Sequence, residues 1–170
     1  MLRQILILTL ITLIPGLELR ASIPIGILGG GFSWLSMGEA QLSPVVVVIV
    51  CLIANILLGW AVFLLMGPVI RLFERFAWFQ RWVDPLLQRA HRKLGPYVTK
   101  YGGIGVAIFI GVPLPGSGVY TGAVGAYLLG VSKRSFAWAN VLGVLIAGAA
   151  VTAVTLLANS VPWLQWIIKH

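Results

Sequence analysis

Glu18 is the residue of this chain best suited to carry chemistry, because it is the only acidic residue inside an apolar run. It lies with Arg20 in a polar interruption, residues 14–24, which Pro15 and Gly16 break. An ionisable side chain within a membrane is costly, so such residues usually mark ion or substrate pathways. A carboxylate here could load and release a proton or bind a cationic substrate. The alternative is an ion pair with Arg20 that only holds the tip of the interruption.

A second interruption, residues 111–122, lies between two further short apolar runs. Its turn-forming and polar residues are Pro113, Pro115, Gly116, Ser117, Gly118 and Tyr120. The Gly-Ser-Gly sequence can present backbone N–H groups just before a helix start, where partial positive charge binds anions. In the first interruption, the planar fork of Arg20 suits a phosphate headgroup. Both tips, including Pro15 and Gly16, are therefore candidate sites for an anion or a headgroup, and a plain tight turn is the alternative for the second.

The composition places these interruptions in a membrane protein. The chain of 170 residues is 59% hydrophobic and 9% charged, whereas an ordinary soluble domain is about a quarter charged. The net charge of +8 does not indicate nucleic acid, because residues 68–100 hold seven basic residues against two acidic ones. Basic loops between membrane segments mark the cytoplasmic side. Neither His91 nor His170 has ligand-like neighbours in the sequence, so we expect no metal site, no cofactor and no enzymatic activity.

The apolar runs predict an all-α integral membrane protein built from two similar halves. Two runs are long enough to span a bilayer, which takes about 20 residues, whereas the runs beside the interruptions are shorter. We therefore expect each half to be a re-entrant helical hairpin followed by a transmembrane helix. The first half is residues 1–67 (hairpin 2–32, helix 44–66), the connector is a basic amphipathic segment at 68–96, and the second half is residues 97–170 (hairpin 98–130, helix 135–158). Gly67-Pro68 is expected to end the first long helix, and Gly95-Pro96 to end the connector.

Each expected spanning helix contains one asparagine within a similar local sequence, Asn55 in Ala-Asn-Ile-Leu and Asn140 in Ala-Asn-Val-Leu. Hydrogen bonding between helices is the favoured role for such intramembrane polar residues. The basic loop 68–100 and the turn at Lys133 are expected on the cytoplasmic side of a plasma or inner membrane, with both termini outside. The two halves would then have opposite orientations, as in an inverted repeat.

Two motifs carry a resemblance to a known family. Residues 15–26 (Pro-Gly-x-Glu-x-Arg-x-x-Ile-Pro-x-Gly) and 113–118 (Pro-x-Pro-Gly-Ser-Gly) resemble the putative small multidrug export protein family, which is similar to the DedA membrane proteins. This resemblance covers essentially the whole chain. It implies two re-entrant hairpins that meet near the membrane midplane, with Glu18 at the place of the acidic residue of the first DedA hairpin. The second DedA hairpin usually carries an arginine after its proline, and this chain has none there, with Tyr120 nearby.

Together these observations predict a small multi-pass transporter, an exporter of drugs or other small molecules that is coupled to protons and has its site where the two hairpin tips meet. One alternative is a DedA-like flippase of polyprenyl-phosphate or another phospholipid. An alternative of another class is a non-transporting protein that organises lipids or assemblies. The expected partners are the lipid bilayer, a small ionic or amphiphilic substrate or a lipid headgroup, and further copies of the chain. A homodimer or larger oligomer is expected because two spanning helices and two hairpins leave little protein to shield the polar interruptions from lipid.

Overall fold

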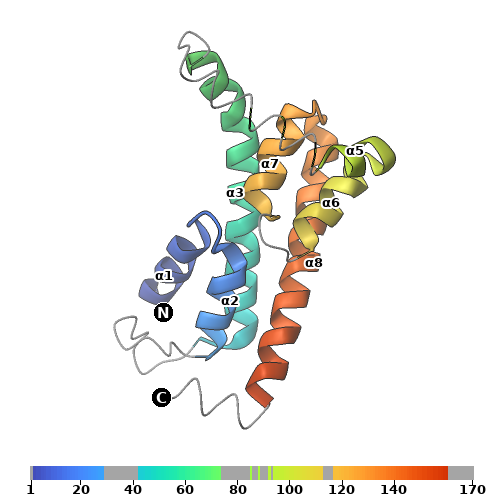
Figure 1. The fold of residues 1–170 in the computed structure, drawn as a ribbon. Coiled ribbons are helices and arrows are strands. Elements are labelled where there is room, and N and C mark those ends of the chain that lie inside the picture. Colours follow the sequence, from blue (N-terminus) through green and yellow to red (C-terminus); the bar gives the residue numbers. More distant parts are fainter. Residues whose placement is uncertain are drawn as a thin grey trace. The chain divides into compact units, whose positions relative to one another are not determined.

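The computed structural model (Figure 1) describes residues 2–28, 42–73, 94–112 and 117–160, together with Pro85, Gln88 and Arg92. Every regular element within these residues is an α-helix. The helices are α1 (Leu2–Thr12), α2 (Glu18–Leu28), α3 (Pro44–Phe73), α5 (Gly95–Tyr101), α6 (Gly103–Gly111), α7 (Val119–Leu128) and α8 (Lys133–Ser160). Most of the predicted amphipathic connector lies outside the described residues.

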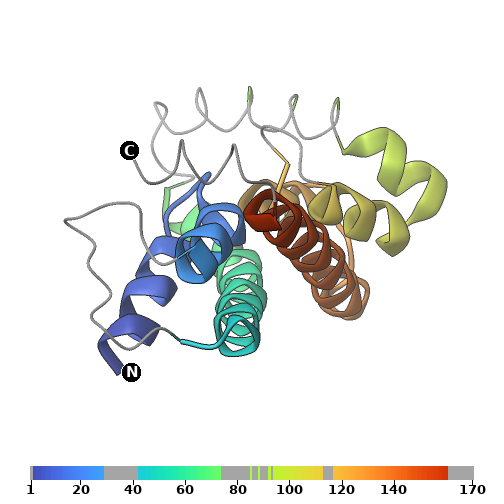
Figure 2. The ribbon, with the colours of Figure 1, turned by 90° about the horizontal axis from the view of Figure 1, so that it is seen from below.

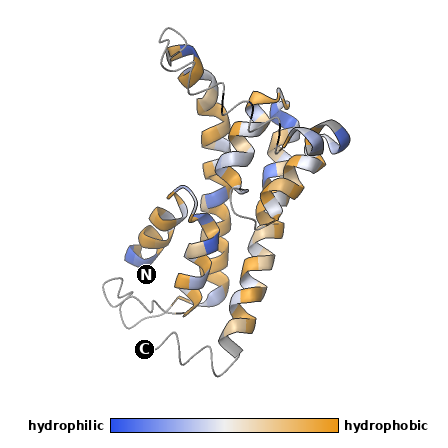
Figure 3. Ribbon diagram, in the orientation of Figure 1, coloured by the Kyte–Doolittle hydropathy of each residue, from blue (hydrophilic) through white to orange (hydrophobic). Residues whose placement is uncertain are grey.

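The two long helices are those predicted to span the bilayer. Pro44–Leu72 and Lys133–Ala158 are long and apolar enough to cross a membrane, with mean hydropathies of 2.9 and 2.4. Only 28% of each span is buried within the chain, and apolar side chains such as Leu57 and Val154 are about two-thirds exposed, at 63% and 67%. Colouring by hydropathy shows the apolar character along both helices (Figure 3). Lipid is the solvent that suits these surfaces, which is consistent with an all-helical membrane protein.

The first long helix is longer than the sequence predicts. Gly67-Pro68 was expected to end it, but α3 continues through this pair to Phe73. Pro68 only removes one N–H from the helix ladder, and helices in a membrane environment tolerate that loss when neighbouring groups compensate. Gly67 is buried against Tyr127 of α7, since a Cβ atom at Gly67 would lie 3.0 Å from the tyrosine hydroxyl. Close packing therefore explains the glycine, which does not act as a helix stop.

The chain divides into two compact units. The first unit is Met1–Asn55 with Leu145–His170, and the second is Ile56–Val144. The first therefore contains the hairpin α1–α2 and the beginning of α3. The second contains the rest of α3, the helices α5, α6 and α7, and the beginning of α8. The first unit thus combines the pair α1–α2, and the second the three short helices α5, α6 and α7, with parts of both long helices.

In the first unit, α1, α2 and the beginning of α3 lie side by side (Figures 1 and 2). The buried core between them includes Leu8, Leu19, Ile23 and Val47, each at most 1% exposed. Gly26 of α2 has no side chain where α3 approaches, and a Cβ atom there would collide with Val47. The absence of a side chain at this position allows α2 to pack closely on α3.

The turn between α1 and α2 is shorter than the predicted interruption. The sequence places the break at residues 14–24, but the helix resumes at Glu18 and includes Pro24. Pro24 cannot donate a hydrogen bond to the carbonyl group of Arg20, so it interrupts the ladder without ending the helix. The break proper is residues 13–17, and Glu18 and Arg20 both belong to α2.

In the second unit, the predicted first arm of the hairpin is two helices. α5 and α6 are separated at Gly102, whose φ of +56° is a left-handed conformation that favours glycine. Gly95-Pro96 opens α5, because proline suits the first turn of a helix. The expected end of the connector at this pair stays a prediction, because most of the connector lies outside the described residues. Ile110 of α6 is 1% exposed and packs into the spaces left by Gly122 of α7 and Gly143 of α8.

Candidate functional site

Glu18 has an unusual backbone conformation at the start of α2. Its φ is +46°, the only positive φ at a non-glycine residue in the described part of the chain. The turn before it is closed by hydrogen bonds from the N–H groups of Leu17 and Glu18 to the carbonyl oxygen of Ile14, at 3.1 and 3.3 Å. Such conformations cost about 1–3 kcal/mol and cluster at functional sites. The positive φ of Glu18 therefore supports a functional role for this residue.

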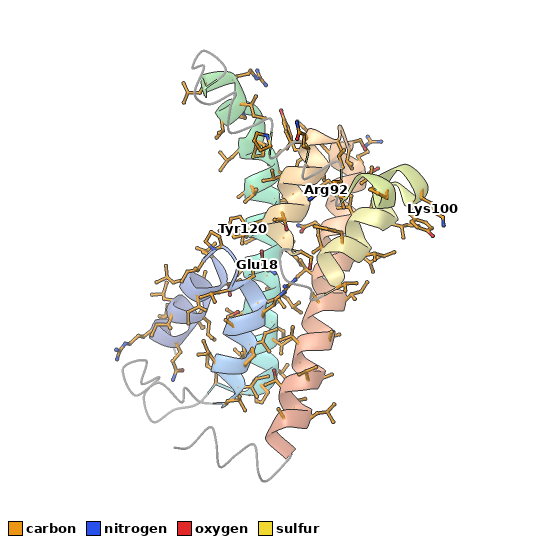
Figure 4. The ribbon with its side chains drawn as sticks, viewed as in Figure 1. Glu18, Arg92, Lys100 and Tyr120 are labelled. Carbon is orange, nitrogen blue, oxygen red and sulfur yellow. The ribbon has the colours of Figure 1, made fainter. Side chains whose placement is uncertain are left out.

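The side chain of Glu18 is buried within the chain. Only 5% of the residue is exposed, and Figure 4 shows it at the end of α2 nearest the turn. Arg20 is half-buried and lies in the same helix. Helical residues two positions apart do not face each other, whereas alternate residues of an extended segment would share a face. Both residues belong to α2, so the shared face that an extended break would give them does not arise.

A cluster of small polar side chains fixes the backbone next to Glu18. The Thr12 hydroxyl donates to the carbonyl oxygen of Leu8 at 2.7 Å and lies 2.9 Å from the Ser22 hydroxyl oxygen. The Ser22 hydroxyl donates to the carbonyl oxygen of Glu18 at 3.0 Å. Both hydroxyl groups lie within hydrogen-bonding reach of the Cys51 thiol. This cluster of Thr12, Ser22 and Cys51 links α1, α2 and α3 and is completely buried.

This cluster has no signature in the sequence that marks it as part of a site. Its members are separated by ten and 29 positions in the sequence, so no local motif connects them. The available signal was helical spacing, because Ser22 lies four residues after Glu18 and Cys51 four residues before Asn55. That spacing places each pair on one helix face, but it does not show which faces meet.

Asn55 is fully buried, and its amide nitrogen and oxygen have no hydrogen-bond partner in the described part of the chain. Leaving a buried polar group without a partner costs about 1–3 kcal/mol. Such a group in a folded protein therefore calls for an explanation, and a ligand is one candidate.

Asn140, the residue at the matching position of α8, has a different environment. Its side-chain N–H group donates to the carbonyl oxygen of Ile56 at 2.9 Å, which links α8 to α3 within the second unit. Gly59 lies against the same amide, because a Cβ atom there would be 2.7 Å from the Asn140 nitrogen. The two asparagines thus share a local sequence, but within the described residues only the Asn140 amide forms a hydrogen bond between helices.

The second predicted tip is described only in part, because Pro113, Pro115 and Gly116 lie outside the described residues. The Ser117 hydroxyl donates to the carbonyl oxygen of Val112 at 2.6 Å and so connects the two ends of the interruption. Gly118 precedes α7 with a φ of +135°, which favours glycine. Tyr120 is half-buried in the first turn of α7 (Figure 4). In this conformation the Ser117 hydroxyl proton is therefore used within the chain.

The described residues contain no group of three histidine, cysteine or acidic side chains that could hold a metal ion. In the comparisons, the model of a family described as putative small multi-drug export protein matches residues 18–150. No curated protein and no solved structure matches the chain. The matched span begins at Glu18 and includes both long helices for most of their length.

Proposed function

The chain belongs to the putative small multi-drug export protein family, and we propose that it is a proton-coupled exporter in which Glu18 carries the coupling proton. Family membership confirms the resemblance seen in the sequence motifs and gives a transporter-like role in a membrane. The observation that supports the specific mechanism is the position of Glu18. A buried carboxyl group at the turn of a short helical hairpin, next to strained backbone, is an arrangement typical of transport pathways.

The lengths of the short helices support re-entrant hairpins. α1 and α2 have 11 residues each, or about 16 Å of helix, which is roughly half of the hydrocarbon thickness of a bilayer. α6 and α7, with 9 and 10 residues, are no longer. No single helix of either pair is long enough to cross the membrane, so each hairpin enters and returns on the same side. We propose that the two hairpins enter from opposite sides as an inverted repeat and that both tips contribute to the transport pathway.

The charges support one orientation of this repeat. Arg71 at the end of α3, Lys100 in α5, and Lys133 and Arg134 at the start of α8 are all exposed. Basic residues near the ends of membrane helices mark the cytoplasmic side. We therefore propose that these helix ends are cytoplasmic in a plasma or inner membrane and that both termini are outside.

The exposed turn of the first hairpin supports an oligomer. Residues 13–17 are exposed in the single chain, and turn backbone in contact with hydrocarbon costs several kcal/mol for each unsatisfied group. A second copy of the chain would cover part of this surface. We propose a homodimer or larger assembly. A mass measurement in mild detergent should find that protein which retains transport activity is not a monomer.

Substitution of Glu18 by glutamine tests the mechanism. Glu18→Gln preserves shape and most hydrogen bonding but removes the titrating group. In liposomes with an imposed pH gradient, we expect ethidium export by this variant to fall at least about tenfold, with unchanged folding and oligomeric state. Glu18→Asp, which retains a titrating group, is the matched control and should keep part of the activity. Normal proton-driven export by Glu18→Gln would leave Glu18 with a structural role only.

A phospholipid flippase is the second candidate, and the half-buried Arg20 favours it. A guanidinium group binds phosphate with two parallel hydrogen bonds, and lysine cannot reproduce this geometry. Movement of a fluorescent polyprenyl-phosphate in the same liposomes would therefore be impaired by Arg20→Lys, while ethidium export would be less affected. The exporter mechanism predicts the reverse sensitivity, with Glu18→Gln as the more harmful change. A lipid-organising scaffold would show neither activity.

A further inference from the structure

One end of the second unit contains an aromatic cluster built from three helices. The Phe63 ring of α3 stacks on the Phe136 ring of α8 with the centroids 4.2 Å apart, and it meets the Tyr127 ring of α7 edge to face at 5.7 Å. One turn further along α3, a Cβ atom at Gly67 would lie 3.0 Å from the Tyr127 hydroxyl group. These contacts determine which residues of α3, α7 and α8 lie together at this end of the unit.

Basic side chains lie at the edge of the aromatic cluster. Arg71 follows Gly67 by four residues and so shares its face of α3, and the guanidinium nitrogen Nη2 of Arg71 is 3.8 Å from the Cβ position of Gly67 that the Tyr127 hydroxyl also approaches. Lys133 precedes Phe136 by three residues, which places it on the face of α8 that packs on α3. Colouring by hydropathy shows hydrophilic positions at both of these helix ends (Figure 3). Arg71 and Lys133 are exposed and Tyr127 is half-buried, so all three can reach a ligand at the surface.

The positive charge at this end is not balanced by acidic residues. The second unit has nine basic residues and only two acidic ones, Glu74 and Asp84, and none of its described residues is acidic. Lys133 also lies in the first turn of α8, where the helix dipole is positive and a basic side chain is unfavourable. An anion bound beside Arg71 and Lys133 would relieve this repulsion.

The surroundings of these groups suit a phospholipid. A guanidinium group binds a phosphate with two parallel hydrogen bonds, and the Tyr127 hydroxyl and the Lys133 ammonium group can donate further ones. Leu64 and Leu65, in the preceding turn of α3, are 47% and 58% exposed and give acyl chains an apolar surface next to the basic groups. Basic sites between membrane helices bind anionic headgroups, whereas a zwitterionic headgroup would bring its own ammonium group close to two cations.

We propose that Arg71, Tyr127 and Lys133 form a binding site for an anionic phospholipid at the end of α3 and the start of α8. The Arg71 guanidinium group and the Tyr127 hydroxyl donate hydrogen bonds to the headgroup phosphate, and the Lys133 ammonium group adds a second positive charge. This site shares no residue with the proposed transport mechanism, so it goes beyond that function and does not depend on it.

A pair of lipids with the same acyl chains tests the proposal. Native mass spectrometry of the purified full chain in detergent measures the binding of dioleoylphosphatidylglycerol, which is anionic, and of dioleoylphosphatidylcholine, which is zwitterionic. The wild-type protein should bind the anionic lipid at least about tenfold more tightly. Arg71→Gln and Lys133→Gln should each reduce this preference about fivefold. Tyr127→Phe, which keeps the aromatic ring beside Phe63, should reduce it about threefold.

Lys100→Gln is the matched control, because it removes one exposed positive charge of the same unit at another place. Lys100 belongs to α5, and its ammonium nitrogen lies over the Tyr101 ring, 5.1 Å from the centroid. This variant should keep the wild-type preference. An equal loss for Lys100→Gln and for the two site variants would show only a general attraction between basic residues and anionic lipid, which would overturn the site. Equal binding of the two lipids by the wild-type protein, or displacement of the anionic lipid by inorganic phosphate, would refute a lipid headgroup as the ligand.

Discussion

Replacement of Gly59 by alanine should destabilise the second unit through Asn140. A Cβ atom at this position would lie 2.7 Å from Val119 and 2.7 Å from the Asn140 amide nitrogen, and would collide with the amide oxygen. Real Cβ atoms do not approach other atoms so closely, so the Asn140 side chain must move. Its hydrogen bond to the Ile56 carbonyl group would then weaken or break.

The size of the effect follows from three contributions. Overpacking of a filled interior costs about 1–3 kcal/mol, and loss of one hydrogen bond costs about 0.5–1.5 kcal/mol. The higher helix propensity of alanine returns up to about 1 kcal/mol. The net loss in the free energy of unfolding is therefore about 0.5–4.5 kcal/mol, with a middle value of about 2.5 kcal/mol. For a chain of this length, each kcal/mol lowers Tm by about 2–4 °C, so the middle value corresponds to a fall of about 5–10 °C.

The assay is thermal unfolding of the purified protein in detergent, followed by circular dichroism. Gly95→Ala is the control, because Gly95 is also helical and a Cβ atom there meets nothing within 4 Å. A second control is the double variant Gly59→Ala with Asn140→Ala, which removes the side chain that the new methyl group strikes. The combined loss should be smaller than the sum of the single losses by about 1 kcal/mol. An unchanged Tm for Gly59→Ala, or strict additivity in the double variant, would refute this account.

Further outcomes are expected elsewhere in the chain. Ile110→Ala should lower the free energy of unfolding by about 2–5 kcal/mol, because it leaves a cavity among closely packed helices. A smaller loss in denaturant titration would mean that the neighbouring side chains relax to fill the cavity. Ser22→Ala should lower the free energy of unfolding by about 0.5–1.5 kcal/mol in the same titration, since it removes the hydrogen bond to the carbonyl group of Glu18, the first residue of α2. An unchanged free energy of unfolding would show that this bond makes no net contribution to stability. Cys51 should react with maleimide only after unfolding, because it is 0% exposed, and equal rates in native and unfolded protein would contradict its burial. Single cysteines at the positions of Arg71 and Lys133 should both be labelled from the cytoplasmic side, and labelling from opposite sides would exclude the inverted repeat.

The class of the protein was predictable from the sequence because it depends on composition and run length. A chain with 59% hydrophobic and 9% charged residues requires lipid as solvent, and two runs of sufficient length predict the helices α3 and α8. Family membership was also predictable, because the motifs that carry it are local in the sequence. The sequence further identified Glu18 as the one acidic residue in an apolar run.

Local rules were less reliable at prolines and glycines. Pro24 and Pro68 both lie inside helices, although the sequence predicted a break at residues 14–24 and a helix end at Gly67-Pro68. A proline removes one donor from the helix ladder, and packing against neighbouring helices determines whether that loss ends the helix. The true break at residues 13–17 could therefore not be located from the sequence.

Which polar residues meet was determined only by the tertiary structure. Thr12, Ser22 and Cys51 come from three helices, and nothing in their spacing along the chain predicts one buried cluster. Asn55 and Asn140 have nearly the same local sequence, yet one amide bonds to the neighbouring long helix and the other is buried without a partner in the described residues. Sequence patterns specify the face on which a side chain lies, whereas the partner of that face depends on how separate helices pack, which is a long-range property of the whole chain.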